Sequence, residues 1–405
     1  MPLLELNLAK TLMLAVLLVW LGRFVRSKVT FLVNWSIPEA VVGGTLFAIL
    51  TLILHSTGML EFKFDTKLQS FFMYLFFTAS GFEASASLMK KASGKLLIFI
   101  VLAGVLAVLQ NATVVGLSPV VGMDPKLGLM TGSIPLTGGH GNAAAYAPLA
   151  EKAGVQGAVT VAVAAATYGL AAGSILGGPV ATRLIKKYHL YDPNEKDTSD
   201  AEALEEAGKV IPLDGKRFAL GCALTLIAFG IGAFLMDLFS LVFPGVNFPI
   251  HVMGMVGGAI VRNIYDALKK SSKATPEKEI DILGSVCLSM FVSMAVMTMR
   301  LWELAALAIP LILLLVAGTL VTILFTYFIT FRALGKDYDA AVMVAGHIGF
   351  GLGAVPASMA NMNALTDVYR YSKLAFIIVP VVGGMFSNFT NAANITFFMN
   401  LVGIH

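Results

Sequence analysis

Two glycine-rich stretches hold the residues best suited to binding a small ligand: TGGHGN at 137–142 and GFGLGAVP at 349–356. Glycine leaves backbone N–H and C=O groups open to a ligand, and Pro135 and Pro148 around the first stretch rule out an ordinary uninterrupted helix. A helix that starts after such a turn presents free N–H groups and about half a positive charge. We therefore interpret both stretches as turns that bind an anion.

Two converging helix starts would offset about one negative charge, the net charge of an amino acid with two carboxylates and one ammonium. No arginine lies in the middle of an apolar stretch to take that role, although serine and threonine hydroxyls could add donors. The alternative is that glycine only permits close helix packing. The predicted ligand-binding residues are Ser133, Thr137, Gly138, Gly139, His140, Gly141, Asn142, Gly346, His347, Gly349, Gly351, Gly353 and Ser358.

His140 and His347 raise the question of a metal site or a proton relay. A lone histidine in or beside each stretch is more often hydrogen-bonded to nearby backbone, so a direct role as ligand is the minor alternative. The sequence contains neither an HExxH motif nor a pair of carboxylates within the apolar stretches that would suggest hydrolysis at a metal. These features argue against an enzyme and predict no cofactor.

The last apolar stretch, residues 373–400, is unusually polar. Ser387, Asn391 and Asn394 are four and seven residues apart, which places them on one face of a helix. Amide and hydroxyl oxygens suit a hard cation such as sodium, whereas the alternative is hydrogen bonding between helices. The sodium-ligand candidates are Gln110, Asn111, Asn361, Asn363, Ser387, Asn391 and Asn394.

The composition shows what must position these residues. Of 405 residues, 57% are hydrophobic and 13% charged, with mean hydropathy +0.83, whereas a soluble domain is about 25% charged. The chain therefore belongs in a bilayer, surrounded by lipid, and no nucleic-acid partner is expected. Ten stretches are apolar enough to be membrane helices, near residues 8–25, 37–54, 69–89, 95–118, 155–185, 218–243, 248–264, 280–299, 304–331 and 373–400.

Basic residues between these stretches orient the chain. Arg23, Arg26 and Lys28 follow the first stretch, and other basic clusters lie near residues 90–95, 186–217 and 269–278. All belong on the cytoplasmic side. With the N-terminus outside, five crossings precede the linker 186–217, so residues 133–148 must enter and leave on one face. Non-helical backbone at membrane depth is tolerated only where protein buries it or a watery cavity adjoins it.

An internal repeat links the two halves of the chain. At an offset of 211, the recurring residues are Pro38, Gly43, Ala48 and Ile49 with Pro249, Gly254, Ala259 and Ile260. At an offset of 213, they are Gly122, Asp124, Met130 and Gly138 with Gly335, Asp337, Met343 and Gly351.

The predicted fold is an all-α integral membrane protein with two inverted-topology repeats, residues 1–185 and 218–405, joined by a cytoplasmic linker, residues 186–217. Each repeat has five transmembrane helices and a re-entrant segment, and an odd number of crossings turns the second copy upside down. Matched interruptions in inverted repeats mark the binding site of a secondary transporter. A channel filter is the other membrane reading, and inverted rather than parallel repeats disfavour it.

Glu83 is the carboxylate most clearly inside an apolar stretch, which makes it a functional candidate. It lies about two helical turns before Lys90 and Lys91, at the basic end of that stretch. An ion pair with either lysine is the favoured interpretation, and a role within the membrane is the alternative.

With these motifs in view, the chain resembles the bacterial glutamate:sodium symporters. The motifs are IPEAVVGG at 37–44, SIPLTGGHG at 133–141, GGPVA at 177–181, GKDYDAAVMVAGHIGFGLGA at 335–354 and ANM at 360–362, and the resemblance covers nearly the whole chain. It implies symport of glutamate with sodium, the coupling ion, across the inner membrane by a multi-pass homodimer. It also implies opposed re-entrant segments and an elevator-like movement.

The chain departs from the family pattern at three positions. Asn142 and Ala143 stand where family members carry Thr and Gly, and Glu83 stands where they carry Asn. A sodium-coupled carrier of other carboxylates, such as citrate or malate, is the alternative function, because helix ends bind anions without requiring an ammonium.

Overall fold

The computed structural model describes residues 2–30, 32, 37–85, 94–191, 213–242, 250–269, 275–303, 307–366 and 368–404. The longer helices are α1 (Leu8–Lys28), α3 (Glu39–Ser56), α4 (Lys67–Gly81), α6 (Gly94–Leu117), α8 (Gly139–Lys152), α9 (Ala158–Tyr188), α11 (Gly215–Val242), α12 (Ile250–Leu268), α13 (Glu277–Met297), α14 (Ala308–Phe325), α16 (Tyr338–Leu352), α17 (Val355–Thr366), α18 (Lys373–Pro380) and α19 (Ser387–Leu401). The shorter elements are β1 (Leu3–Leu6), β2 (Glu61–Phe64), α7 (Pro125–Gly128), α15 (Phe331–Ala333), the 3₁₀ turns η1 (Leu129–Thr131) and η2 (Leu301–Glu303), and the π-helical turns η4 (Thr326–Thr330) and η5 (Val381–Phe386).

Each of the ten predicted apolar stretches contains a helix, and eight of the described spans are long and apolar enough to cross a membrane. This agrees with the predicted all-α membrane protein. The other two are α12, with 19 residues, and α4, with 15. The end predicted for the third stretch, residue 89, is too late, because α4 ends at Gly81. Residues 86–93 and most of the linker 186–217 lie outside the described part of the chain.

The apolar runs of about 20 residues that indicate membrane helices do not predict the two-stranded parallel ribbon of β1 with β2, because each strand has only four residues. Glu5 and Lys63 join the strands through an ion pair of 2.8 Å between Oε1 and Nζ. This hydrogen bond lowers the pKa of Glu5 and raises the pKa of Lys63. Both side chains are exposed, so the pair contributes little to stability.

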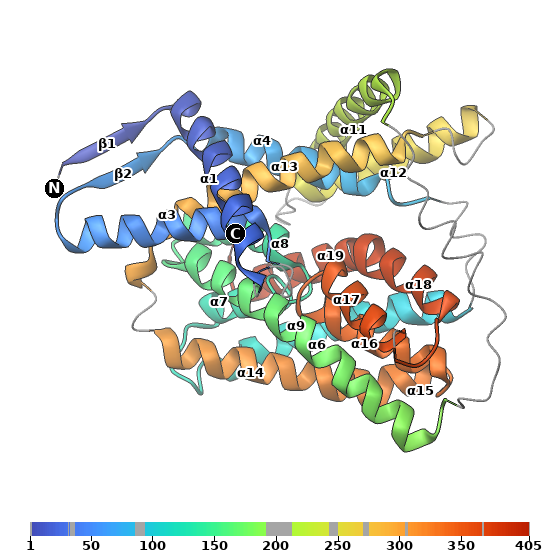
Figure 1. Cartoon of the computed structure of the whole chain (residues 1–405). Helices are drawn as coiled ribbons and strands as arrows, with labels where there is room; N and C mark the ends of the chain where they lie inside the picture. Colours follow the sequence, from blue (N-terminus) through green and yellow to red (C-terminus); the bar gives the residue numbers. More distant parts are fainter. Residues whose placement is uncertain are drawn as a thin grey trace.

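The helices form two layers, one above the other in Figure 1. The upper layer contains α1, α3, α4, α11, α12 and α13, in which α1 packs on α3, α11 on α12, and α4 on both α12 and α13. The lower layer contains α6, α8, α9 and α14–α19, and α16 lies at its centre, in contact with α6, α9, α17 and α18. Every residue of α16 from Ala340 to Leu352 is buried, as expected for a helix enclosed by others.

Glycines set the close crossings of the upper layer in both halves of the chain. A Cβ atom on Gly43 of α3 would lie 1.7 Å from the carbonyl oxygen of Leu18 in α1. A Cβ atom on Gly257 of α12 would lie 2.2 Å from the carbonyl oxygen of Ala228 in α11. Both helix pairs therefore pack backbone to backbone, as small residues allow in membranes.

The offset of 213 also relates two matching local structures. Gly122 and Gly335 both have positive φ, +76° and +113°. Two residues later, Asp124 caps α7 by accepting a hydrogen bond from the Lys126 N–H, and Asp337 caps α16 by accepting one from the Ala340 N–H. The same turn chemistry thus starts the interrupted segment in each half.

Both glycine-rich stretches interrupt helices. In the first half, α7 and η1 lead into an irregular turn over residues 132–138, and α8 starts at Gly139. In the second half, α16 ends at Leu352, Gly353 and Ala354 form the break, and α17 starts at Val355. The helices α16 and α17 form an antiparallel hairpin, in which Gly349 lies against Ser358, and Asn361 donates to the carbonyl oxygen of Ala345.

Candidate functional site

A cavity of about 440 Å³ lies between the two layers, where the two interruptions meet. The contact is close, since a Cβ atom on Gly139 would lie 2.8 Å from the carbonyl oxygen of Gly353. We call this space the tip cavity. Its lower-layer wall is formed by Thr137, Gly138, Gly139, His140, Gly141, Asn142, Leu170, Gly353, Ala354, Val355, Pro356, Gly383, Gly384 and Asn388, and its upper-layer wall by Pro38, Glu39, Ala40, Phe76, Ser80, Glu83, Leu288, Ser289 and Val292.

Helix starts face the tip cavity from both halves of the chain. No side chain caps the first turn of α8, and Gly139 enters it with φ +59°, a conformation that glycine adopts without strain. In the second half, α17 starts at Val355, which also lines the cavity. In α8 the N–H groups of Gly139, His140 and Gly141 precede the bond from the Asn142 N–H to the Gly138 carbonyl oxygen, so they are available to an anion in the cavity. At the start of α17 the Val355 N–H is the available donor, because Pro356 has no N–H and the N–H groups of Ala357 and Ser358 donate to the Ala354 carbonyl oxygen.

A hydrogen-bond network ties the two turns together behind the cavity. The Thr137 hydroxyl donates to Gln110 Oε1 at 2.7 Å and to the carbonyl oxygen of Gly351 at 3.3 Å. Gln110 Nε2 donates to that same carbonyl oxygen at 2.6 Å and to Thr322 Oγ1 at 3.0 Å. The amide of Gln110, a sodium candidate, therefore braces the two turns from α6.

His140 is the histidine that lies at the cavity. Its Nε2 is 3.0 Å from the hydroxyl of Thr167 on α9, which in turn donates to the carbonyl oxygen of Val163. His347 lies elsewhere, buried among Phe99 and Phe350, with Nδ1 3.1 Å from the Thr330 hydroxyl. The described residues contain no group of three or more His, Cys, Asp or Glu that could hold a metal.

Other predicted ligand-binding residues build the hairpin and do not line the cavity. Ser358 donates to the carbonyl oxygen of Gly346 at 2.7 Å, and a Cβ atom on Gly349 would lie 2.4 Å from the Ser358 nitrogen. Gly351 packs against Leu106. At these three glycines the structure shows the alternative role, close packing.

The sodium candidates divide into a cluster and scattered residues. Asn361 links α17 to α9 by donating to the carbonyl oxygen of Gly173 at 2.7 Å. Asn363 is exposed on α17, and Ser387 is buried on α19 without lining the cavity.

The cluster lies beneath the first turn and consists of Asn111, Ser133, Asn391 and Asn394, all buried. Asn111 Oδ1 accepts from the Ser133 N–H at 2.7 Å, Asn391 Nδ2 donates to the Ser133 carbonyl oxygen at 3.0 Å, and Asn394 Nδ2 donates to the Ser133 hydroxyl at 3.1 Å. Within the described chain, Asn394 Oδ1 and Asn111 Nδ2 find no hydrogen-bond partner. A buried carbonyl oxygen without a donor is costly unless a ligand occupies it.

The polar residues at the cavity that the predicted ligand set leaves out are Glu39, Ser80, Glu83, Ser289 and Asn388. Asn388 lies on the polar last helix, but the spacing of four and seven residues selects Ser387, Asn391 and Asn394 as the shared polar face and leaves Asn388 out. Its Nδ2 donates to the carbonyl oxygen of Gly384 at 2.6 Å, and the residue lines the cavity. The sequence favours an ion pair of Glu83 with Lys90 or Lys91, which lie outside the described residues. The IPEAVVGG motif is the sequence signal for the upper wall, since Pro38, Glu39 and Ala40 line it.

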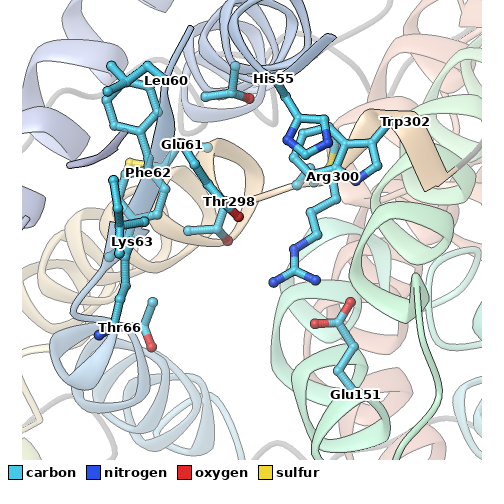
Figure 2. Close-up of a pocket in the computed structure, with 15 residues that line it drawn as sticks. His55, Leu60, Glu61, Phe62, Lys63, Thr66, Glu151, Thr298, Arg300 and Trp302 are labelled. Carbon is cyan, nitrogen blue, oxygen red and sulfur yellow. The ribbon is translucent and has the colours of Figure 1, made fainter. Parts of the chain in front are cut away.

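A second cavity of about 530 Å³ lies beside the β1–β2 ribbon (Figure 2). His55 and Trp302 stack there with ring centroids 4.0 Å apart, and the charged ends of Arg300 and Glu151 point toward one another (Figure 2). None of the predicted ligand or sodium residues lines it. The tip cavity, although smaller, is the better candidate because helix starts from both halves face it.

A family model and three curated proteins that match most of this chain all carry the same description. The family model for "Sodium/glutamate symporter" matches residues 4–371. A protein named sodium/glutamate symporter from Haemophilus influenzae is 40% identical over 387 residues, 95% of each chain. Proteins of the same name from Escherichia coli and Shigella flexneri are each 37% identical over 402 residues, 98% of each chain.

Proposed function

Because the chain belongs to the sodium/glutamate symporter family, we propose that it carries glutamate together with sodium across the bacterial inner membrane, through the tip cavity. It is a multi-pass membrane transporter and not an enzyme. Similarity over nearly the full length of all three relatives carries the proposal, because it includes both interruptions and every helix around them.

In this proposal, the substrate carboxylates bind the free N–H groups in the first turn of α8 and the Val355 N–H at the start of α17. The cavity of about 440 Å³ falls within the range of about 300–1,000 Å³ common for small-ligand sites. Thr137, His140 and Asn142 line the same wall and can add hydrogen bonds. Gly138, Gly139, Gly141 and Gly353 keep that wall free of side chains, so the substrate can reach the backbone.

We place one sodium site at the cluster of Asn111, Ser133, Asn391 and Asn394. Asn394 Oδ1 supports this placement, because it is a buried amide oxygen with its lone pairs unused among the described residues. Sodium there would bind oxygens held on α19 and on the turn before α8. Since Ser133 is four residues from Thr137 of the tip cavity, the ion would stabilise the same turn that receives glutamate.

The transport movement proposed is an elevator between the two layers of a homodimer with inverted repeats. The lower layer supplies both helix starts and the asparagine cluster, so it can carry its ligands as one body. The upper layer would stay fixed and form the dimer contact. The matched caps at Asp124 and Asp337 support the repeat, and the antiparallel hairpin of α16 and α17 supports a segment that enters and leaves on one side.

Uptake is expected to couple more than one sodium to each glutamate. Bringing one net negative charge into a cell with an inside-negative potential costs about 2.3 kcal/mol per 100 mV, and a single sodium only makes the step electroneutral. A second sodium lets the potential drive uptake, and each ion adds about 1.4 kcal/mol at a tenfold gradient. Counting labelled sodium against labelled glutamate in proteoliposomes measures the ratio, and a ratio of one would overturn this prediction.

The function itself is tested by glutamate uptake into proteoliposomes with and without an inward sodium gradient. We expect saturable uptake that requires the gradient. A channel would show unitary currents instead of saturation. A carrier of other carboxylates would take up citrate or malate in preference to glutamate, and either result would reject the proposal.

A further inference from the structure

The upper-layer wall of the tip cavity carries two carboxylates, and their surroundings differ. Glu39, at the start of α3, lies 3.9 Å from Arg23 Nε and 3.8 Å from Arg26 Nη1 through its Oε1. Those two arginines offset its charge. Glu83, just beyond the end of α4, has no side-chain hydrogen bond and no ion pair with any residue in the described part of the chain.

Arg262 lines a small cavity together with Glu83, but its hydrogen bonds go to other groups. Arg262 of α12 is buried, with Nε donating to Asp266 Oδ2 at 2.8 Å, Nη1 to the carbonyl oxygen of Phe82 at 2.6 Å and Nη2 to Glu277. The bond to Phe82 fixes the backbone directly before Glu83. Arg262 therefore holds the backbone next to Glu83, while its positive charge is paired with the carboxylates of Asp266 and Glu277.

Glu83 lies where the tip cavity adjoins a smaller one. This smaller cavity, of about 230 Å³, is lined by Glu83 together with Arg262, Glu277 and Asp281 of the upper layer and residues 380, 381 and 385 of the lower layer. The Glu83 carboxylate also reaches the opposite layer, because a Cβ atom on Gly384 would lie 3.4 Å from its Oε2. An accessible carboxylate thus faces the tip cavity from the wall opposite the starts of α8 and α17.

This arrangement places opposite potentials across one small cavity. The helix starts favour negative groups, whereas an unpaired carboxylate favours a cation and repels an anion. A dicarboxylate without an amino group would satisfy the helix starts and meet repulsion from Glu83. An amino dicarboxylate can satisfy both walls, because it presents an ammonium to Glu83.

We infer that Glu83 binds the α-ammonium group of the substrate and makes the tip cavity select amino dicarboxylates over plain dicarboxylates. The inference rests on the proposed function, in which the tip cavity is the substrate site. It assigns Glu83 a role in specificity and gives the upper layer a direct contact with the substrate.

The test compares glutamate with glutarate, which has the same carbon chain and both carboxylates but no amino group. Labelled glutamate uptake into proteoliposomes gives the half-saturating concentration for glutamate and the inhibition constant for glutarate. The ratio of the glutarate inhibition constant to the glutamate half-saturating concentration should fall by about 10- to 100-fold in Glu83→Gln, the contribution expected of one charge-assisted hydrogen bond. The half-saturating concentration of sodium should stay unchanged. Because both constants come from the same vesicles, the ratio does not depend on how much protein folds.

Two further variants sharpen the comparison. Glu61→Gln removes a carboxylate that lines the cavity beside the β1–β2 ribbon and not the tip cavity, and it should leave the ratio at the wild-type value. Glu83→Asp keeps the charge and should retain more selectivity than Glu83→Gln.

An unchanged ratio in Glu83→Gln would overturn the inference, and this is the result expected if Glu83 serves only to pair with Lys90 or Lys91. A change confined to the sodium dependence would overturn it as well, because Glu83 would then bind the coupling ion. If the wild-type protein itself shows no sodium-driven glutamate uptake, the proposed function has failed instead.

Discussion

Replacing Gly139 with valine is expected to lower sodium-driven glutamate uptake by about 100-fold or more, the loss that a displacement of about 1 Å can cause at a site of this kind. Two observations explain the size of the effect. Gly139 has φ +59°, which a β-branched residue adopts only with strain, and its Cβ atom would lie 2.8 Å from the carbonyl oxygen of Gly353. The substitution therefore pushes the two turns apart and moves the start of α8.

The matched control is the same substitution at Gly116, in α6. A Cβ atom there would meet no atom within 4 Å, so Gly116→Val should insert and transport like the wild type. Both variants are measured in proteoliposomes after their amounts have been equalised. Near-normal uptake by Gly139→Val would show that the contact between the turns does not form the site.

Replacing Asn394 with alanine is expected to raise the half-saturating sodium concentration by about 10- to 100-fold, as loss of a hydrogen-bonding partner for a charged group predicts. The substitution removes Oδ1, the buried oxygen without a partner among the described residues, and also the hydrogen bond from Nδ2 to the Ser133 hydroxyl. Sodium dependence of glutamate uptake at saturating glutamate is the measurement.

Two variants separate sodium binding from a general effect on α19. Asn394→Asp keeps an oxygen in place and should retain sodium affinity closer to that of the wild type. Asn400→Ala removes an asparagine that only donates to the carbonyl oxygen of Thr396 in its own helix, and it should leave the sodium dependence unchanged. Equal sodium affinity in Asn394→Ala and the wild type would show that this cluster is not a sodium site.

The sequence predicted the helical membrane architecture well because long apolar runs have few alternatives in a bilayer. It also predicted that 137–142 and 349–356 interrupt helices, since glycine and proline act locally. The predicted stretch 69–89 extends beyond the end of α4, because the apolar pattern continues past the backbone turn after Gly81. The β1–β2 ribbon depends on pairing between residues 58 positions apart, which no local pattern reveals.

Within the candidate site, glycine-rich motifs could not separate the residues that face a ligand from those that hold the turns. Gly139 and Gly353 lie at the cavity, whereas Gly346 and Gly349, in the same kind of motif, pack against neighbouring residues. Periodicity did bring Asn391 and Asn394 to one face, yet their contact with Ser133 is a tertiary pairing across about 260 residues.

Glu83 shows a different limit of sequence reasoning. Its sequence neighbours Lys90 and Lys91 made an interfacial ion pair the favoured interpretation. The groups that define its position in the described structure, Arg262 and Gly384, are about 180 and 300 residues away in the chain. A local charge pattern cannot reveal an environment built from the other half of the protein.

The most direct test of the account is protection of both turns by the substrate. Gly141→Cys places a thiol in the first helical turn of α8, and Ala354→Cys places one in the break before α17, both at the cavity. The Cβ atom at residue 141 would meet only ordinary contacts, at 3.5 Å or more. Each is made with Cys222 and Cys287 replaced by serine, and exposed Thr57→Cys is the control. We predict that glutamate with sodium slows maleimide labelling at 141 and at 354 and leaves 57 unchanged. Protection of only one turn, or of neither, in protein that still transports glutamate would contradict a shared site.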